Sequence, residues 1–224
     1  PTTPGDSVLN EFKNYDDLLA AKKITGSDVS YVIPRRNWTT GTTYDIYRHD
    51  YEEFVTGSTS TRVTANSTAT TLFDSTFYVL TSDRNVYKCL DNDGNTASTV
   101  EPTGTSTSVI TTGDGYKWKY MYTLSAAQQS NFLSTDFMAV ATNSTVSSAA
   151  TDGGIDIVKI KTAGSSYTVS GGGTSGTITG VPIRGDGSSA VCSVTLTSGA
   201  ITAVTITANG SGYTSGYIRN ADII

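Results

Sequence analysis

The chain has 224 residues, a formal net charge of −5 and 16% charged residues. This length accommodates one large domain or two small ones, and the acidic balance argues against nucleic-acid binding, which needs a basic surface. No apolar run approaches the roughly 20 residues that span a bilayer, and the first residues show no secretory-signal pattern. We therefore expect a soluble protein without a nucleic-acid or membrane partner.

The composition favours short strands joined by turns, in a mainly-β (α+β) fold. Gly accounts for 22 residues and Ser plus Thr for 66, and these residues suit pleated surfaces and tight turns. Cys89 and Cys192 are too few for a disulfide framework or a four-cysteine zinc site, so we expect synthesis in a reducing compartment. Because the chain starts at Pro1 without Met and stops at Ile224, we expect it to be a fragment.

The first region, residues 1–141, is predicted to begin with a helix over residues 6–23. Asp6 or Ser7 can cap this helix, and Gly26 ends it. Residues 29–33 then alternate into an extended segment that precedes Pro34. The apolar residues of the helix recur at spacings of three and four, namely Val8, Phe12, Tyr15, Leu18 and Leu19.

The middle of the first region is predicted to form strands. Residues 72–80 and 86–90 have strand composition, and the Asp-Asn-Asp-Gly-Asn sequence at 91–95 predicts a turn and a hairpin, since Asp-Gly readily adopts positive φ. A further strand over residues 116–122 carries a ring at every second position. That spacing predicts one buried aromatic face, formed by Tyr116, Trp118, Tyr120 and Tyr122.

Two segments close the first region and separate it from the rest. Ser125 and Gln128 have capping-box spacing, which predicts a short helix over residues 125–133 that docks on the preceding strand. Residues 142–154 are small and polar with little to bury, so they are predicted to form a linker.

Residues 155–224 are predicted to form a Gly-rich β-domain with an internal repeat. Residues 155–168 match residues 201–214 at 7 positions, with an offset of 46. In both copies an alternating segment precedes a Gly-Ser-x-Tyr-Thr sequence, so each unit is predicted to be a strand, a tyrosine-anchored turn and a return strand.

Motifs that could carry chemistry are weak in this sequence. His49 is the sole histidine and has no nucleophile motif to accompany it. The 91–95 turn lacks the Gly and Glu positions of a calcium loop, although a weak structural calcium there stays an alternative. Residues 171–176 fit GxGxxG, but a predicted strand follows, so no dinucleotide site is expected. We expect no catalytic residues, no metal and no cofactor.

Other side chains have a functional and a structural interpretation. The adjacent acids Asp16–Asp17 and Glu52–Glu53 would diverge, which does not suit the paired carboxylates of a glycosidase. The aromatic row at 116–122 could stack against sugars, but burial in a core or an interface is the favoured interpretation.

Five motifs in one order across about 120 residues resemble the dimeric baseplate wedge subunit of T-even-type phages and their marine and cyanobacterial relatives. The resemblance covers roughly residues 4–135 and is lost after residue 151, where the repeats are similar to β-modules of marine phage virion proteins. The motifs are Pro4–Val8, Val32–Trp38, Val86–Asp91, Glu101–Gly104 and Asp114–Tyr120.

This resemblance implies a two-layer β-sandwich-like region with helical extensions, a homodimer in each wedge, and contacts with other baseplate wedge subunits. It implies a non-enzymatic virion protein of a contractile tail, made in the host bacterial cytoplasm. Because Arg and Trp often anchor interfaces, we predict Arg35, Arg36 and Trp38 at a subunit contact, with Tyr116 and Trp118 as further candidates.

Two other functions stay open at the level of sequence. The repeat domain could be a glycan-binding module of a tail or an adhesin. A polysaccharide-degrading enzyme of the tail is the second alternative, but it needs two carboxylates across a cleft, and no convincing pair is evident.

Overall fold

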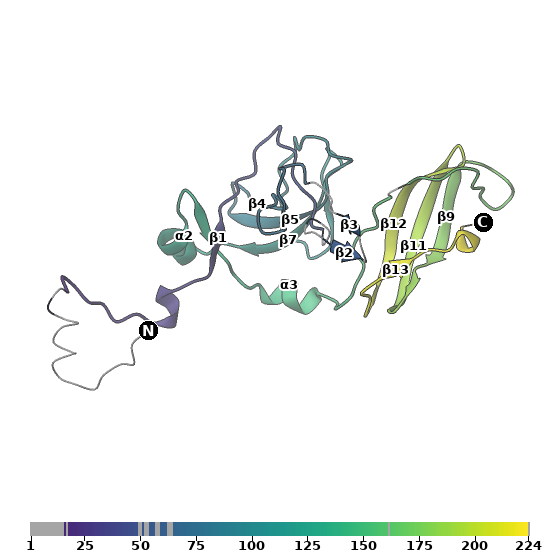
Figure 1. Cartoon of the computed structure of the whole chain (residues 1–224). Coiled ribbons are helices and arrows are strands. Elements are labelled where there is room, and N and C mark those ends of the chain that lie inside the picture. The colour runs from purple at the N-terminus through teal and green to yellow at the C-terminus, as the bar shows by residue number, and fades with distance from the viewer. Residues whose placement is uncertain are drawn as a thin grey trace.

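The computed structural model describes residues 16, 18–48, 51, 54–56, 59–61, 65–160 and 162–223. It is mainly β, which confirms the predicted fold class. Figure 1 shows three parts in chain order: an arm (residues 18–31), a first unit (residues 32–141) and a second unit (residues 153–223), with the arm and the second unit at opposite ends. The two-layer sandwich predicted for the first region stays a prediction.

The first unit is built on an antiparallel sheet with strand order β4-β5-β7-β6. Its strands are short except for the two central ones, which pair along most of their length with two irregularities in register. The bounds are β4 Tyr78–Leu80, β5 Asn85–Asp91, β6 Ile110–Thr111 and β7 Lys117–Thr123.

One face of this sheet is the aromatic core that the sequence predicted. Tyr116, Trp118 and Tyr120 are buried together with Tyr44 and Tyr87. The rings of Tyr116 and Trp118 stack with centroids 5.4 Å apart, and Tyr44 meets Trp118 edge to face at 5.7 Å. Such offset and edge-to-face pairs are the favoured arrangements of aromatic rings.

A second buried cluster joins the end of β7 to the remaining elements of this unit. Tyr122 and Leu124 pack there against Met138 of β8 (Phe137–Ala139), which pairs with β1 (Val32–Pro34). The predicted short helix is α2, Ala126–Phe132, and Ser125 and Gln128 form its capping box. Two further strands, β2 Phe54–Thr56 and β3 Thr59–Thr61, form a hairpin.

The turn at residues 91–95 is present, but the predicted hairpin is wrong. Asp93, Gly94 and Asn95 all have positive φ, as the Asp-Gly sequence indicates. However, β5 pairs with β4 and β7 and not with the strand that follows it in sequence, because β6 pairs with β7. One partner of β5, β4, precedes it closely in sequence, whereas the other, β7, is distant, so the turn at 91–95 sets neither pairing.

The segment between the units is partly helical. Residues 142–154, predicted as a linker, contain α3 (Ser144–Ala149), whose N-terminus is capped by Asn143 accepting from the Val146 N–H at 3.0 Å. No residue of this helix is fully buried, but its Val146 is partly buried and packs against the aromatic core cluster of the first unit.

The second unit contains an antiparallel sheet with order β12-β11-β9 and a small β10-β13 pair. Alternate residues of β11 form its core, including Cys192, Val194 and Leu196. The bounds are β9 Gly176–Pro182, β10 Arg184–Gly185, β11 Ser188–Thr197, β12 Ala200–Ser211, β13 Gly216–Tyr217 and the 3-10 turn η3 Asn220–Asp222.

The two repeat copies lie antiparallel to each other and are related by internal twofold pseudosymmetry. The Ile155 N–H donates to the Asn209 carbonyl at 2.9 Å, and the Ile201 N–H donates to the Ala163 carbonyl at 3.0 Å. With the offset of 46 residues, each of these bonds is the counterpart of the other. The Tyr213 to Gly153 and Tyr167 to Gly199 backbone bonds, at 3.1 and 3.0 Å, form a second such pair.

The secondary structure does not follow the repeat. The second copy forms strand β12, whereas residues 155–160 are not a strand, so the predicted strand in the first copy is wrong. Between the two end bonds, this segment runs beside β12 without the ladder of backbone bonds that defines a strand.

Candidate functional site

The arm carries large apolar side chains that remain exposed and have no packing partner among the described residues. Leu19 is fully exposed and Tyr31 is 87% exposed, and the arm extends away from the first unit (Figure 1). A patch of this kind marks an interaction site more often than a free surface. Its exposed apolar residues are Leu18, Leu19, Ile24, Val29, Tyr31 and Val32.

Within the predicted helix over residues 6–23, Asp16 is helical and residues 18–23 are not, whereas residues 1–15 and 17 lie outside the described residues. A short helix depends on packing of its apolar face, and Leu18 and Leu19 are exposed and pack on none of the described residues. The regular element of the arm is instead the turn η1, Gly26–Asp28. Asp28 accepts from the Thr25 N–H at 2.8 Å, and this bond is the main cause that lowers the pKa of Asp28.

The apolar surface continues from the arm onto the β1–β8 ribbon. The Val140 N–H donates to the Tyr31 carbonyl at 2.8 Å, so these two exposed residues are neighbours. Phe137, paired with Pro34, is also half exposed. We refer to the arm together with Val32, Phe137 and Val140 as the assembly surface.

Arg35 and Arg36, predicted at a subunit contact, hold loops of their own chain. Arg35 donates to the Ser134 carbonyl at 2.8 Å and to Asn37 Oδ1 at 2.9 Å. Arg36 donates to the Asp74 carbonyl at 2.9 Å and lies over the Tyr78 ring at 5.3 Å. These bonds fix the segment that connects the assembly surface to the core, and the subunit contact itself stays a prediction.

Trp38, Tyr116 and Trp118 lie at or inside the aromatic core. Trp38 is partly buried and donates from Nε1 to Ser98 Oγ at 3.1 Å. Tyr116 and Trp118 are 0% exposed, so neither ring can touch a second subunit or a sugar unless the core opens. For these two residues the interface assignment is wrong, and core burial is the observed role.

Asp114, in the last of the five motifs, organises the loop beside this core. Its carboxylate accepts from the backbone N–H groups of Thr99 and Val100 at 2.8 and 3.0 Å and from Ser98 Oγ at 3.0 Å. Burial opposes ionisation, but the hydrogen bonds led by that from Thr112 outweigh it and lower the pKa of Asp114 to about 2. The sequence motif therefore marks a structural loop.

The structure does not arrange the candidate metal-binding, catalytic and dinucleotide-binding residues into a site within its described ranges. Within the described ranges, no group of three or more His, Cys, Asp or Glu side chains is placed to hold a metal ion. His49 and Glu52–Glu53 lie outside the described residues. Burial raises the pKa of the Cys89 and Cys192 thiols, which disfavours the reactive thiolate. The GxGxxG stretch leads into β9, as expected.

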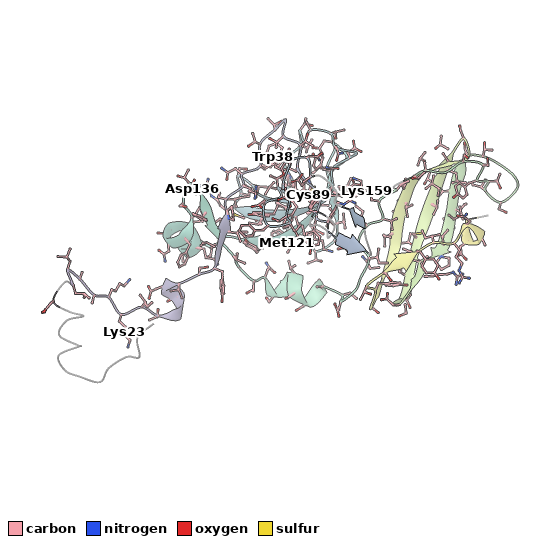
Figure 2. All side chains as sticks on the ribbon, viewed as in Figure 1. Lys23, Trp38, Cys89, Met121, Asp136 and Lys159 are labelled. Atoms are coloured by element: carbon pink, nitrogen blue, oxygen red, sulfur yellow. The ribbon has the colours of Figure 1, made fainter. Side chains whose placement is uncertain are left out.

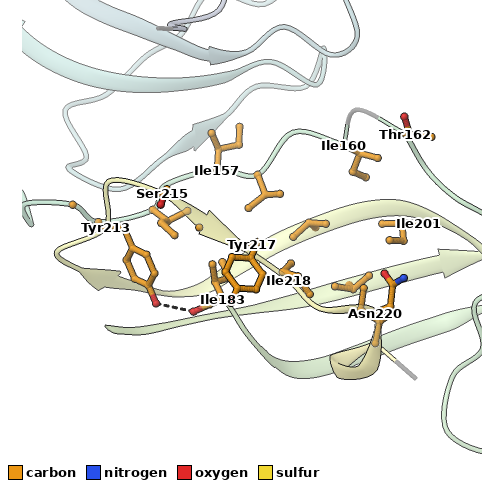
Figure 3. Close-up of a pocket in the computed structure, with 18 of the residues that line it drawn as sticks. Ile157, Ile160, Thr162, Ile183, Ile201, Tyr213, Ser215, Tyr217, Ile218 and Asn220 are labelled. Carbon is orange, nitrogen blue, oxygen red and sulfur yellow. Dashed lines mark hydrogen bonds between the residues drawn. The ribbon is translucent and has the colours of Figure 1, made fainter. Parts of the chain in front are cut away.

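A pocket of about 540 Å³ lies on the sheet of the second unit (Figure 3). Isoleucine and valine, such as Ile157 and Ile201, make up half of its lining, and Tyr217, which also lines it, is 54% exposed. The Tyr213 hydroxyl is already used, since it donates to the Ile183 carbonyl at 2.7 Å. The polar groups available to a ligand include Ser215 and Asn220.

Two features of the molecule were not predicted from the sequence: the exposure of the arm and the position of the lysines of β7. The spacing of apolar residues in the arm was interpreted as one face of a helix. Leu18 and Leu19 are adjacent, and no strongly apolar segment follows them, which could have indicated that their side chains are exposed. The lysines that alternate with aromatics in β7, Lys117 and Lys119, had to lie on the face opposite the core, and that face borders the second unit.

Comparison of the chain with protein families, with curated proteins and with solved structures finds no match. In the part of the chain that the structure describes, no helix has the length and apolar character needed to cross a bilayer.

Proposed function

We propose that this chain is a structural, non-catalytic virion subunit of a phage tail baseplate wedge, where it forms a homodimer and joins neighbouring wedge subunits. The assembly surface is the observation that carries this proposal. Its apolar residues project from the body on an arm with few contacts of its own, and burying such residues against another chain is favourable by about 25 cal/mol per Å². The ordered sequence motifs add the resemblance to a wedge subunit.

This arrangement suits the shape change of a baseplate at infection. An arm that binds a neighbour through apolar contacts can shift or release as a unit, while the first unit keeps its aromatic core. Switching of packed interfaces is a common route to such transitions.

The proposal is tested by light scattering of the purified chain, alone and mixed with the other wedge proteins. We expect a dimer that joins a larger complex. Leu19→Glu should shift the dimer toward monomer or block its entry into the complex, because a charge would be buried in the contact. Phe73→Glu changes another exposed apolar residue away from the assembly surface and should leave both states unchanged. A wild-type monomer that ignores the wedge proteins would contradict the proposal.

Glycan binding by the second unit is the second candidate, favoured by exposed Tyr217 beside Ser215 and Asn220 at the pocket. Aromatic rings suit the apolar faces of sugars. Glycan-array binding by the full chain, lost in Tyr217→Ala, would support this function in place of the structural one.

A further inference from the structure

The sheet face opposite the aromatic core of the first unit is lined with lysines. Lys88 of β5 lies directly opposite Lys119 of β7, and Lys117 lies opposite Asp91. Like charges directly opposite each other on one sheet face are unfavourable. The chain as a whole has a net charge of −5, so this concentration of positive charge is a local feature.

The lysine face forms one wall of a cavity of about 740 Å³ between the two units. We call this cavity the interunit cleft. Across it, Asp156 accepts two bonds of 3.0 Å from the Lys119 ammonium group, and Lys117 lies 3.5 Å from Asp91. Two of the three lysines in the wall are therefore paired with a carboxylate.

Lys88 is the third lysine, and no described carboxylate lies within 4.0 Å of it. Its ammonium group lies 4.5 Å from the centre of the Tyr47 ring. Burial lowers the pKa of Lys88, Lys119 lowers it further, and Asp156 opposes this. A further negative charge in the cleft would compensate both the burial and the repulsion.

The rest of the lining indicates what could carry that charge. Thr107, Ser108 and Thr111 provide hydroxyl groups, and Met121, Val146 and Ile206 provide apolar surface. A free inorganic anion would use the lysine and the hydroxyls but not the apolar surface, and the volume far exceeds what such an ion fills. A peptide of several residues would use all three kinds of group.

From this charge complementarity we infer that the interunit cleft binds an acidic peptide segment of a partner protein, with a carboxylate of that segment at Lys88. The inference rests on the proposed function only for the partner's identity, which would be another wedge subunit. The cleft itself stands on the charges and the volume described above.

The test is isothermal titration of the full chain with a hexaglutamate peptide, with hexaglutamine as the uncharged control. We expect hexaglutamate to bind and hexaglutamine not to, with affinity falling as salt rises. Lys88→Met keeps the apolar stem and should weaken binding at least about fivefold, which corresponds to the loss of one charge-assisted contact. Arg219→Met removes one positive charge from an exposed residue outside the cleft lining and should leave the affinity unchanged.

Several results would overturn the inference: no heat with hexaglutamate, equal effects of Lys88→Met and Arg219→Met, or inorganic phosphate binding as tightly as the peptide, which would indicate a site for free anions. If the chain forms a dimer that joins the wedge complex but does not bind the peptide, only the inference of peptide binding in the interunit cleft would be contradicted. Peptide binding by a monomer that ignores wedge proteins would overturn the proposed function alone.

Discussion

Single carboxylates hold the loops of this Ser- and Thr-rich chain. Asp45 is fully buried and accepts from the backbone N–H groups of Ser67 and Thr76 at 3.0 and 2.7 Å. Asp186 in the second unit accepts from the N–H groups of Thr214 and Ser215, both at 3.0 Å. The hydrogen bond from the Thr214 hydroxyl is the largest cause that lowers the pKa of Asp186 to about 2, and the two backbone bonds add to it. Backbone groups in such loops need a partner, and an ionised carboxylate provides several acceptors at once.

We expect the Asp114 carboxylate to stabilise the folded protein in a pH-dependent way. Its folded pKa of about 2 lies below the ordinary value of 3.8, so its stabilisation is complete above about pH 4 and is lost as the pH falls toward 2. Asp114→Asn should lower the free energy of unfolding at pH 7 by about 2 kcal/mol, since one pKa unit corresponds to about 1.4 kcal/mol. Urea unfolding at pH 7 and pH 3 measures this.

Asp136→Asn is the matched control, because its exposed carboxylate accepts no hydrogen bond from the described residues. We expect it to unfold like the wild type at both pH values. Equal stability of Asp114→Asn and Asp136→Asn at pH 7 would show that the Asp114 loop contributes little to folding.

The turns of the second unit depend on glycine where two strands approach closely. Gly210 lies near the end of β12, beside Ser211, which pairs with Ser188 of β11. It has a φ of +62°, and a Cβ there would lie 2.5 Å from the Ser188 carbonyl oxygen. Gly212 has a similar φ of +73°, but a Cβ there would meet nothing closer than 3.9 Å. The two positions therefore share the backbone conformation and differ in available space.

Gly210→Ala should cost more stability than Gly212→Ala. Both variants have the penalty of a left-handed residue, about 1–2 kcal/mol, and Gly210→Ala adds a contact with the backbone of β11 that side-chain movement cannot relieve. Thermal unfolding followed by circular dichroism measures the difference. Equal losses would mean that β12 can shift away from β11 at this point.

Local sequence patterns predicted the elements that local interactions determine. The alternation of rings from Tyr116 to Tyr122 predicted β7 and its buried face, and the Ser125 and Gln128 capping box predicted α2. The helix α3 was missed because its composition of small polar residues gives no apolar period, while the cap at Asn143 is a weak signal by itself.

Features that depend on distant partners could not be predicted in the same way. The turn at 91–95 indicated a hairpin, but the partner of β5 is β7, which lies more than twenty residues later. Lys88 faces Lys119 only because of that pairing, so the charge of the interunit cleft is not evident in either strand alone. Trp118 was likewise predicted at an interface because of its residue type, whereas in the structure its side chain is fully buried.

At the scale of the whole molecule, a few polar contacts made by the first repeat copy connect the two units. Asp156 pairs with Lys119 at 3.0 Å, and Lys159 lies 4.0 Å from Asp91, both reaching from the second unit to the lysine face. Figure 2 labels Lys159 between the two units. These pairs are partly exposed, and such pairs contribute about 0–1 kcal/mol each and weaken with salt.

We therefore expect the angle between the units to depend on Asp156. In Asp156→Asn, the Lys119 ammonium group loses its carboxylate partner on the second unit, which removes one of the ion pairs that connect the two units. Small-angle X-ray scattering should show a larger maximum dimension than for the wild type at low salt. Raising the salt to about 0.5 M should expand the wild type toward the variant, since screening then removes most of the ion-pair energy.

Asp152→Asn removes an exposed carboxylate from the same connecting segment and should not change the scattering profile. Identical profiles for the wild type and Asp156→Asn at low salt would show that other contacts fix the two units. If instead the profile expands as expected, the second unit is held by contacts weak enough for a neighbouring subunit to replace. The proposed role in a baseplate, where contacts change with its shape, would need a connection of this kind. The acidic partner segment proposed for the cleft would compete with Asp156 for the same lysines.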